Sequence, residues 1–233
     1  LTAIQRFYSY RYYSLFSSSF SDGGKVQNES GIYLGAKWSP LSRLSILAYS
    51  DYAYFPWARY TASKTSHSWD NMLQTTYTIS RSLTLSTRYR LRIRQQDYND
   101  AETTKKKILI NKTEHRARLS LAYNGKHFNA KTQIDGAYAV FPSGMQGLEN
   151  SCGGMIMQTI GYNHDAITVA VNVGYFNTQD YNSRIYAYER STLYSFNFPM
   201  YYGEGMRGAL FVRGSIGNSL IIICLLYTSD AAD

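Results

Sequence analysis

Cysteine, proline and long hydrophobic runs are the scarcest features of this 233-residue sequence. Its two cysteines give neither a disulfide framework nor the spacing of a metal site. The marked apolar run LIIICLL, which begins at Leu220, is much shorter than the roughly 20 residues that a membrane-spanning helix needs. This excludes a helical membrane protein. It does not exclude a transmembrane β-barrel, whose strands need only about 9–11 residues of alternating polarity.

Acidic residues are outnumbered, and the composition favours strands. The 24 lysines and arginines and the 16 aspartates and glutamates give a net charge of +8. Such a charge indicates anionic partners (nucleic acid, lipid phosphates or anionic solutes) without choosing among them. Tyrosine is abundant, with 23 residues, whereas only 17% of the chain is charged and only four residues are proline. This balance predicts an all-β protein.

A two-residue period is the strongest local pattern. In LTLSTRYRLRIR, Leu83 to Arg94, one set of alternate residues is mainly apolar and the other contains four arginines. Successive side chains of a strand point to opposite faces, so this stretch predicts a strand with one apolar and one cationic face. The same period recurs over residues 31–38, 69–79, 114–123, 127–140 and 166–176, and less cleanly over 44–55 and 153–162.

The connections between these segments alternate in length. Short ones lie at 39–43, 80–82, 124–126 and 163–165, and long polar ones at 18–30, 56–67, 95–113 and 141–152. An antiparallel meander with this rhythm has its tight turns at one end and its long loops at the other, as transmembrane barrels do. Further strands are predicted at 183–189, 193–199, 206–213 and 219–223, with short turns at 190–192 and 214–218 and a loop at 200–205.

These segments number about thirteen, and together they predict an antiparallel up-and-down transmembrane β-barrel. Because bacterial barrels close with an even number of strands, we interpret the chain as an incomplete fragment of a larger barrel. An aromatic rim at the short-turn end supports this interpretation over a soluble sandwich, because membrane–water interfaces favour such rings. The predicted rim residues are Trp38, Tyr77, Tyr123 and Tyr162.

The cationic faces of neighbouring strands are predicted to meet in the barrel lumen. The candidate lumen-lining residues are Arg88, Arg90, Arg92, Arg94, Arg116, Arg118 and Lys131. One interpretation is a pore wall that attracts anions. The other, slightly favoured, is a structural ladder neutralised by Asp51, Asp70, Glu114, Asp135 or loop acids. The loop run KKK at 105–107 could contact lipopolysaccharide phosphates, although such runs are more often simply solvated.

No set of residues predicts catalysis, a cofactor or a metal site. The four histidines are scattered, and the sequence has no phosphate-binding glycine loop and no zinc spacing. A barrel lipase would need a Ser/His pair on the lipid face; His115 is predicted there, but no serine or orienting residue accompanies it. We therefore expect no enzymatic activity.

Both ends of the sequence raise questions of their own. The chain starts at Leu1 with no methionine or signal peptide, so we expect the natural start to lie upstream. The last ten residues, CLLYTSDAAD, resemble the translation of a transposase-type sequencing-library adapter and show no turn or strand pattern. We therefore predict a barrel fragment over residues 1–223 and a non-native tail over 224–233.

One long stretch carries a family resemblance. RIYAYE, FP followed by YYGEGMR, and GSIGNSL, all within Ser183 to Leu220, together with SGIYLGAKWSPLSRLSI from Ser30, resemble the barrel region of a bacteroidete outer-membrane family. Members of that family carry a helix-hairpin-helix, competence-protein-like region ahead of the barrel. The resemblance implies a location in the bacterial outer membrane and a monomeric barrel, and it carries over no DNA-binding residue.

Together, these observations predict a porin-like outer-membrane protein with a pore, transport or uptake role and no catalysis. Its expected partners are membrane lipid, lipopolysaccharide and an anionic solute; nucleic acid is not supported by this part of the chain, and no obligate protein partner is indicated. The alternative is a soluble or surface all-β binding protein with a true apolar core, which would fold without detergent or lipid.

Overall fold

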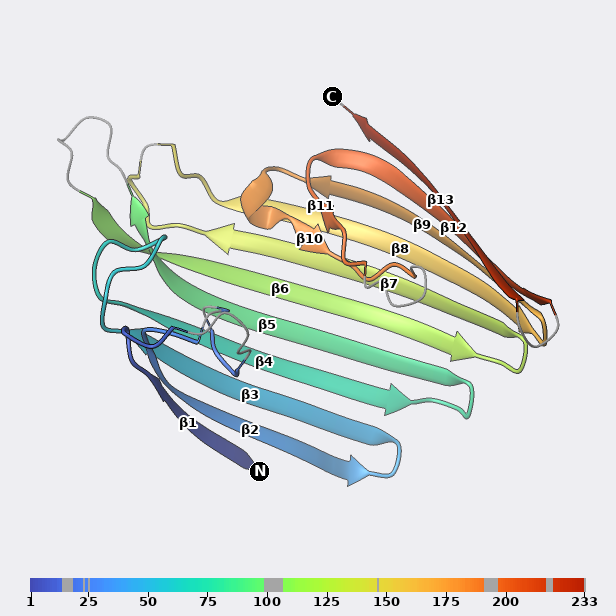
Figure 1. Ribbon diagram of the computed structural model, residues 1–233, viewed down its shortest axis with the longest axis horizontal. Coiled ribbons are helices and arrows are strands. Elements are labelled where there is room, and N and C mark those ends of the chain that lie inside the picture. The colour runs from blue at the N-terminus through green and yellow to red at the C-terminus, as the bar shows by residue number, and fades with distance from the viewer. Residues whose placement is uncertain are drawn as a thin grey trace.

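The computed structural model describes residues 1–13, 19–22, 24, 26–98, 107–145, 147–190, 197–216 and 220–232. Over these residues the chain forms an eleven-stranded antiparallel sheet and a small two-stranded one (Figure 1). The large sheet contains β1 (Thr2–Tyr8), β2 (Glu29–Leu41), β3 (Leu44–Phe55), β4 (Ser66–Thr78), β5 (Leu83–Tyr98), β6 (Ile108–Asn124), β7 (Phe128–Val140), β8 (Ser151–His164), β9 (Ile167–Thr178), β12 (Glu204–Ile216) and β13 (Leu220–Ala232). The prediction of an all-β antiparallel fold is confirmed.

In this sheet every strand pairs with the strand that follows it, as expected for a meander of the predicted strands. The 83–94 pattern lies in β5, whose arginine positions face the corresponding positions of β6: Arg88 pairs with Arg118, and Arg90 with Arg116. We call the face that carries these arginines the inner face and the opposite one the outer face. On the outer face, large apolar side chains such as Leu34, Trp69 and Leu73 are exposed.

The alternation of connection length is also confirmed. The links between strands are short at 42–43, 79–82, 125–127 and 165–166, and long at 9–28, 56–65, 99–107 and 141–150. In Figure 1 the short turns lie at the right end of the sheet, and the strand ends that the long connections join lie at the left. In an antiparallel meander the chain reverses at every turn, so every second connection lies at the same end of the sheet. Because long and short connections alternate, the long ones all join strands at one end.

The segment between β9 and β12 departs from the prediction. The sequence predicts two wall strands at 183–189 and 193–199, but residues 179–190 and 197–203 lie over the inner face of the sheet instead. They contain the 3-10 turn η1 (Tyr181–Ser183) and the two-stranded sheet of β10 (Ile185–Tyr186) and β11 (Met200–Tyr201). We call residues 179–203 the inner segment. Its residues 191–196, which include most of the expected 190–192 turn and much of the second expected strand, lie outside the described residues.

The wrong prediction has a physical cause. Ile185, Ala187 and Glu189 are buried whereas Tyr186 and Tyr188 are exposed, so the segment has a genuine two-residue period. Its buried side packs on the inner face of β7 to β9, in an apolar cluster that includes Met155 and Phe176. An extended segment with one buried side gives the same alternation whether it joins a sheet or lies across it.

The sheet is open over the part of the chain that the structure describes. It curls along its width in Figure 1, but β1 and β13 are both terminal in the strand order and do not pair with each other. The described residues therefore form an antiparallel meander, and they do not close it into a barrel. Among the described residues, no helix is long and apolar enough to cross a membrane.

The C-terminal stretch belongs to a strand, contrary to its sequence pattern. Residues 224–232 continue β13 and pair with β12, so that Cys224 lies opposite Val212 and Asp230 opposite Met206. The predicted strand at 219–223 is thus much longer in the structure. The resemblance to a translated adapter stays a prediction.

Candidate functional site

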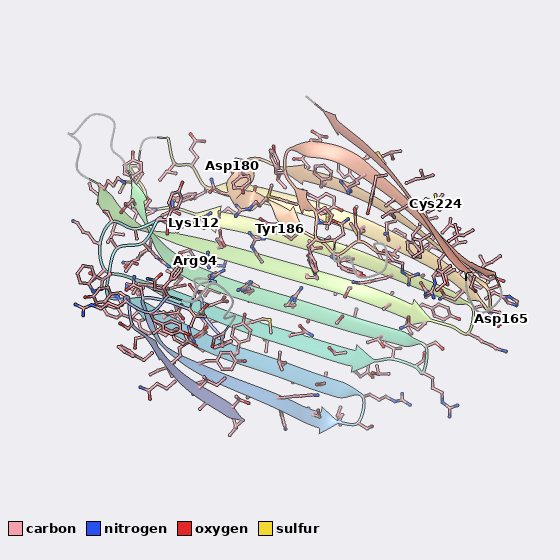
Figure 2. All side chains as sticks on the ribbon, viewed as in Figure 1. Arg94, Lys112, Asp165, Asp180, Tyr186 and Cys224 are labelled. Carbon is pink, nitrogen blue, oxygen red and sulfur yellow. The ribbon has the colours of Figure 1, made fainter. Side chains whose placement is uncertain are left out.

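The structure places all seven predicted lumen residues on the inner face, across three adjacent strands. Arg88, Arg90, Arg92 and Arg94 come from β5, Arg116 and Arg118 from β6, and Lys131 from β7. In Figure 2, Arg94 and Lys112 lie near the end of the sheet that carries the long connections. The residues are neighbours because β5 to β7 pair in a register that keeps even-numbered positions of β5 and β6 on one face.

Four of the seven are paired with carboxylates. The Arg90 Nε donates to Asp70 Oδ1 at 2.8 Å. The guanidinium of Arg92 binds Asp22, and that of Arg94 lies 3.7 Å from the same carboxylate. Arg118 binds Asp135, which also accepts a hydrogen bond from Gln133.

The other three have no carboxylate within 4.0 Å among the described residues: Arg88, Arg116 and Lys131. Arg116 donates to the main-chain carbonyl of Arg184 at 3.1 Å. The pairing expected for a structural ladder therefore exists for part of the wall and is missing for the rest.

The predicted neutralising acids behave differently from one another. Asp70 and Asp135 pair with wall arginines as expected. Glu114 instead binds Lys112 at 2.9 Å. Asp51 binds Arg6, in a buried triad with Glu29 on the inner face of β1 to β3. Nothing local in the sequence indicates this triad, since its members are far apart in the chain and meet only through strand register.

We call the inner face of β5 to β7, which carries the seven predicted lumen residues, the arginine wall. A cavity of about 390 Å³ lies between this wall and the inner segment. The wall contributes arginines from β5 and β6 together with Glu114 and Asp135, and the inner segment contributes Arg184, Ile185, Tyr186 and Phe198. One side of the cavity is thus mainly cationic and the other mainly apolar.

Polar contacts hold the inner segment in place. Arg118 donates to the Tyr186 carbonyl at 2.8 Å, and Lys112 donates to Asn182 Oδ1 at 3.0 Å. Further along the segment, the buried Glu189 carboxylate accepts hydrogen bonds from Arg207 of β12. The sequence pattern does not indicate these contacts, because its alternation assigns Glu189 to a wall strand.

A second set of contacts fixes the start of the inner segment. The Asp180 carboxylate accepts hydrogen bonds from the Ser151 hydroxyl and from the main-chain N–H of Asn182 and Ser183. Burial opposes the charged form, but these hydrogen bonds outweigh it and hold the pKa of Asp180 below its ordinary value.

The four predicted rim aromatics lie together at the short-turn end. Trp38, Tyr77, Tyr123 and Tyr162 are all exposed on the outer face, each within three residues of the end of its strand. Their common level agrees with the predicted ring, and their interfacial role stays a prediction.

Among the described residues, the histidines and the lysine at the end of the KKK run form no site. His115 lies on the outer face, where its Nδ1 is 2.7 Å from the Tyr89 hydroxyl. Over the described part of the chain, no group of three or more His, Cys, Asp or Glu could hold a metal. Lys107 lies 3.7 Å from Asp97, and Lys105 and Lys106 lie outside the described residues.

Comparison of the chain with protein-family models, curated proteins and solved structures gives no match. The resemblance to the helix-hairpin-helix outer-membrane family therefore stays a prediction.

Proposed function

We propose that this chain is part of an outer-membrane β-barrel that admits solutes along a partly arginine-lined lumen and catalyses no reaction. The observation that carries the proposal is the contrast between the two faces of the sheet. The outer face exposes large apolar side chains along most of its strands, among them Ile32, Leu73, Ile134, Ile156 and Val173. The inner face holds most of the charged strand residues that the structure describes, and most of these are in ion pairs.

Lipid explains the outer face better than water does. Soluble monomers rarely expose a contiguous apolar patch larger than a few hundred Å², whereas this surface extends across the whole sheet. Each large aliphatic side chain gains roughly 1.5–3 kcal/mol when it is removed from water. A surrounding hydrocarbon layer would supply that gain without a second protein layer.

The inner face and the connections support a conduit. Charged side chains that point away from lipid can reach water or one another, as they do in the lumen of a transmembrane barrel. The long connections at one end and the exposed aromatic rings at the other match the layout of outer-membrane barrels. Such a barrel would need further strands to pair with the edges β1 and β13, since unpaired strand edges are too costly in lipid.

A soluble or surface all-β binding protein is the alternative. The observation that favours it is the open sheet, whose two edge strands are unpaired within the described part of the chain. In that case another layer or another copy of the chain would cover the apolar face.

Two neighbouring substitutions in the middle of β4 discriminate between these functions. Leu73 is 48% exposed on the outer face, and Gln74 lies next to it on the inner face. In a lipid-embedded barrel, Leu73→Arg should destabilise the full chain by about 2–4 kcal/mol, whereas Gln74→Arg should cost less than about 1 kcal/mol.

The measurement is urea unfolding in phosphatidylcholine vesicles, followed by tryptophan fluorescence, with the wild-type chain in detergent-free buffer as a second sample. We expect the buffer sample to aggregate and the vesicle sample to fold. A monomeric, folded wild-type chain in buffer, with Leu73→Arg harmless, would refute the membrane proposal and support the alternative.

A further inference from the structure

The arginine wall contains charge that the described residues do not neutralise. On the inner face of β4 to β7, eight cationic side chains meet four carboxylates, including Asp22 from the first long connection; the cations are Arg88, Arg90, Arg92, Arg94, Lys112, Arg116, Arg118 and Lys131. The excess is concentrated in Arg88, Arg116 and Lys131. Lys131 is close enough to Arg88 and Arg118 for their charges to repel.

Strand register makes this arrangement costly. Arg88 lies directly opposite Arg118, and Arg90 directly opposite Arg116. Like charges in directly opposed positions destabilise a sheet. Arg118 is compensated by Asp135, directly opposite it on β7, and Arg90 by Asp70 on β4. The charges of Arg88 and Arg116 have no such compensation among the described residues, and a ligand that supplies negative charge explains their position.

Hydrogen-bonding capacity points the same way. A guanidinium carries five N–H donors, and Arg116 uses one of them among the described residues, for the Arg184 carbonyl. The cavity therefore offers donors of fixed geometry, which suit the oxygens of a phosphate or carboxylate.

The opposite side of the cavity sets the size and polarity of the ligand. Ile185, Tyr186 and Phe198 from the inner segment form an apolar side of the cavity, opposite the arginines. The cavity has a volume of about 390 Å³. This volume is within the range of pockets for small organic molecules and exceeds what an inorganic anion requires.

We propose that this cavity binds a small organic anion, whose phosphate or carboxylate group lies against Arg88 and Arg116 and whose apolar part packs on Tyr186 and Phe198. The inference deepens the proposed function by naming the class of solute, and it rests on that function for the route by which the solute arrives. Under this proposal, the paired arginines, such as Arg90, stabilise the wall, whereas the unpaired Arg88 and Arg116 bind the ligand.

Binding can be measured with the full chain in detergent micelles by isothermal titration calorimetry, with phenyl phosphate, inorganic phosphate and benzyl alcohol as probes. We expect phenyl phosphate to bind at least about tenfold more tightly than inorganic phosphate, and benzyl alcohol not to bind. Hydrogen bonds to charged groups contribute about 1.5–3 kcal/mol, so Arg88→Gln and Arg116→Gln should each weaken phenyl phosphate about tenfold or more. Phe198→Ala should weaken phenyl phosphate and leave inorganic phosphate unchanged.

Arg213→Gln is the matched control. Arg213 lies on the inner face of β12, outside the cavity lining, and its replacement removes the same charge. Unchanged affinity in Arg88→Gln and Arg116→Gln, an equal loss in Arg213→Gln, or no binding of phenyl phosphate by the folded wild-type chain would each overturn the proposal.

The two proposals can fail separately. The Leu73→Arg comparison in vesicles tests the membrane assignment, and circular dichroism establishes that each variant is folded. If the chain proves to be folded in buffer without detergent, the same titration in that buffer still decides whether the cavity binds an organic anion.

Discussion

The buried carboxylate of Glu189 offers the sharpest test of how the inner segment is held. Its side chain is 1% exposed. It accepts hydrogen bonds from Arg207 Nε at 2.8 Å, Arg207 Nη2 at 3.1 Å and Asn197 Nδ2 at 3.2 Å, and also from the Tyr201 hydroxyl. Glu189→Gln keeps the shape, removes the charge and turns one acceptor into a donor that faces other donors.

The expected cost follows from burial. Breaking a buried ion pair by changing one partner costs about 3–5 kcal/mol. The Arg207 side chain is 25% exposed, so its unpaired charge can be partly solvated, and the lower end of that range applies. A loss of about 3 kcal/mol corresponds to a roughly 100-fold increase in the population of the detached inner segment.

Hydrogen–deuterium exchange with mass spectrometry measures this population. We expect the Glu189→Gln variant to exchange roughly 100-fold faster in peptides from residues 181–190, with β4 to β6 unchanged. Glu204→Gln is the control, because Glu204 is an exposed outer-face glutamate that accepts from the Tyr175 hydroxyl at 2.8 Å. Unchanged exchange in the inner segment, or an equal acceleration across the whole sheet, would refute the assigned anchoring role.

Two further predictions concern other buried or hydrogen-bonded charges. Arg6→Met should destabilise the chain by about 3–5 kcal/mol in urea unfolding, because it removes the guanidinium that forms ion pairs with the buried Glu29 and Asp51 carboxylates. A loss below about 1 kcal/mol would contradict this. The depressed pKa of Asp180 means that its contribution to stability is fully present above the unfolded pKa of about 3.9 and is lost as the pH falls through the lower folded value. Exchange of the inner segment should therefore accelerate below about pH 4, beyond the intrinsic pH dependence of exchange, and this extra acceleration should be absent in Asp180→Asn. If exchange depends on pH identically in the wild-type chain and in Asp180→Asn, the Asp180 carboxylate is not the source of the extra acceleration.

Much of the candidate site could be predicted from local pattern. The alternation in β5 placed Arg88 to Arg94 on one face, and antiparallel continuity through the 99–107 connection brought Arg116 and Arg118 beside them. The partners of these arginines could not be predicted in the same way. Asp22 reaches Arg92 from a connection 70 residues away in sequence, and only the path of that connection determines the contact.

The sequence alone determined the all-β meander, the two faces of its strands and the gathering of long connections at one end. Each follows from the period of two along an extended chain and from the reversal of direction at every turn. Only the tertiary structure decided that the inner segment lies across the sheet, that Glu189 binds Arg207, and which arginines have carboxylate partners. The physical reason is that alternation records which side of an extended segment is covered, whereas the identity of the covering surface depends on contacts between residues far apart in the chain.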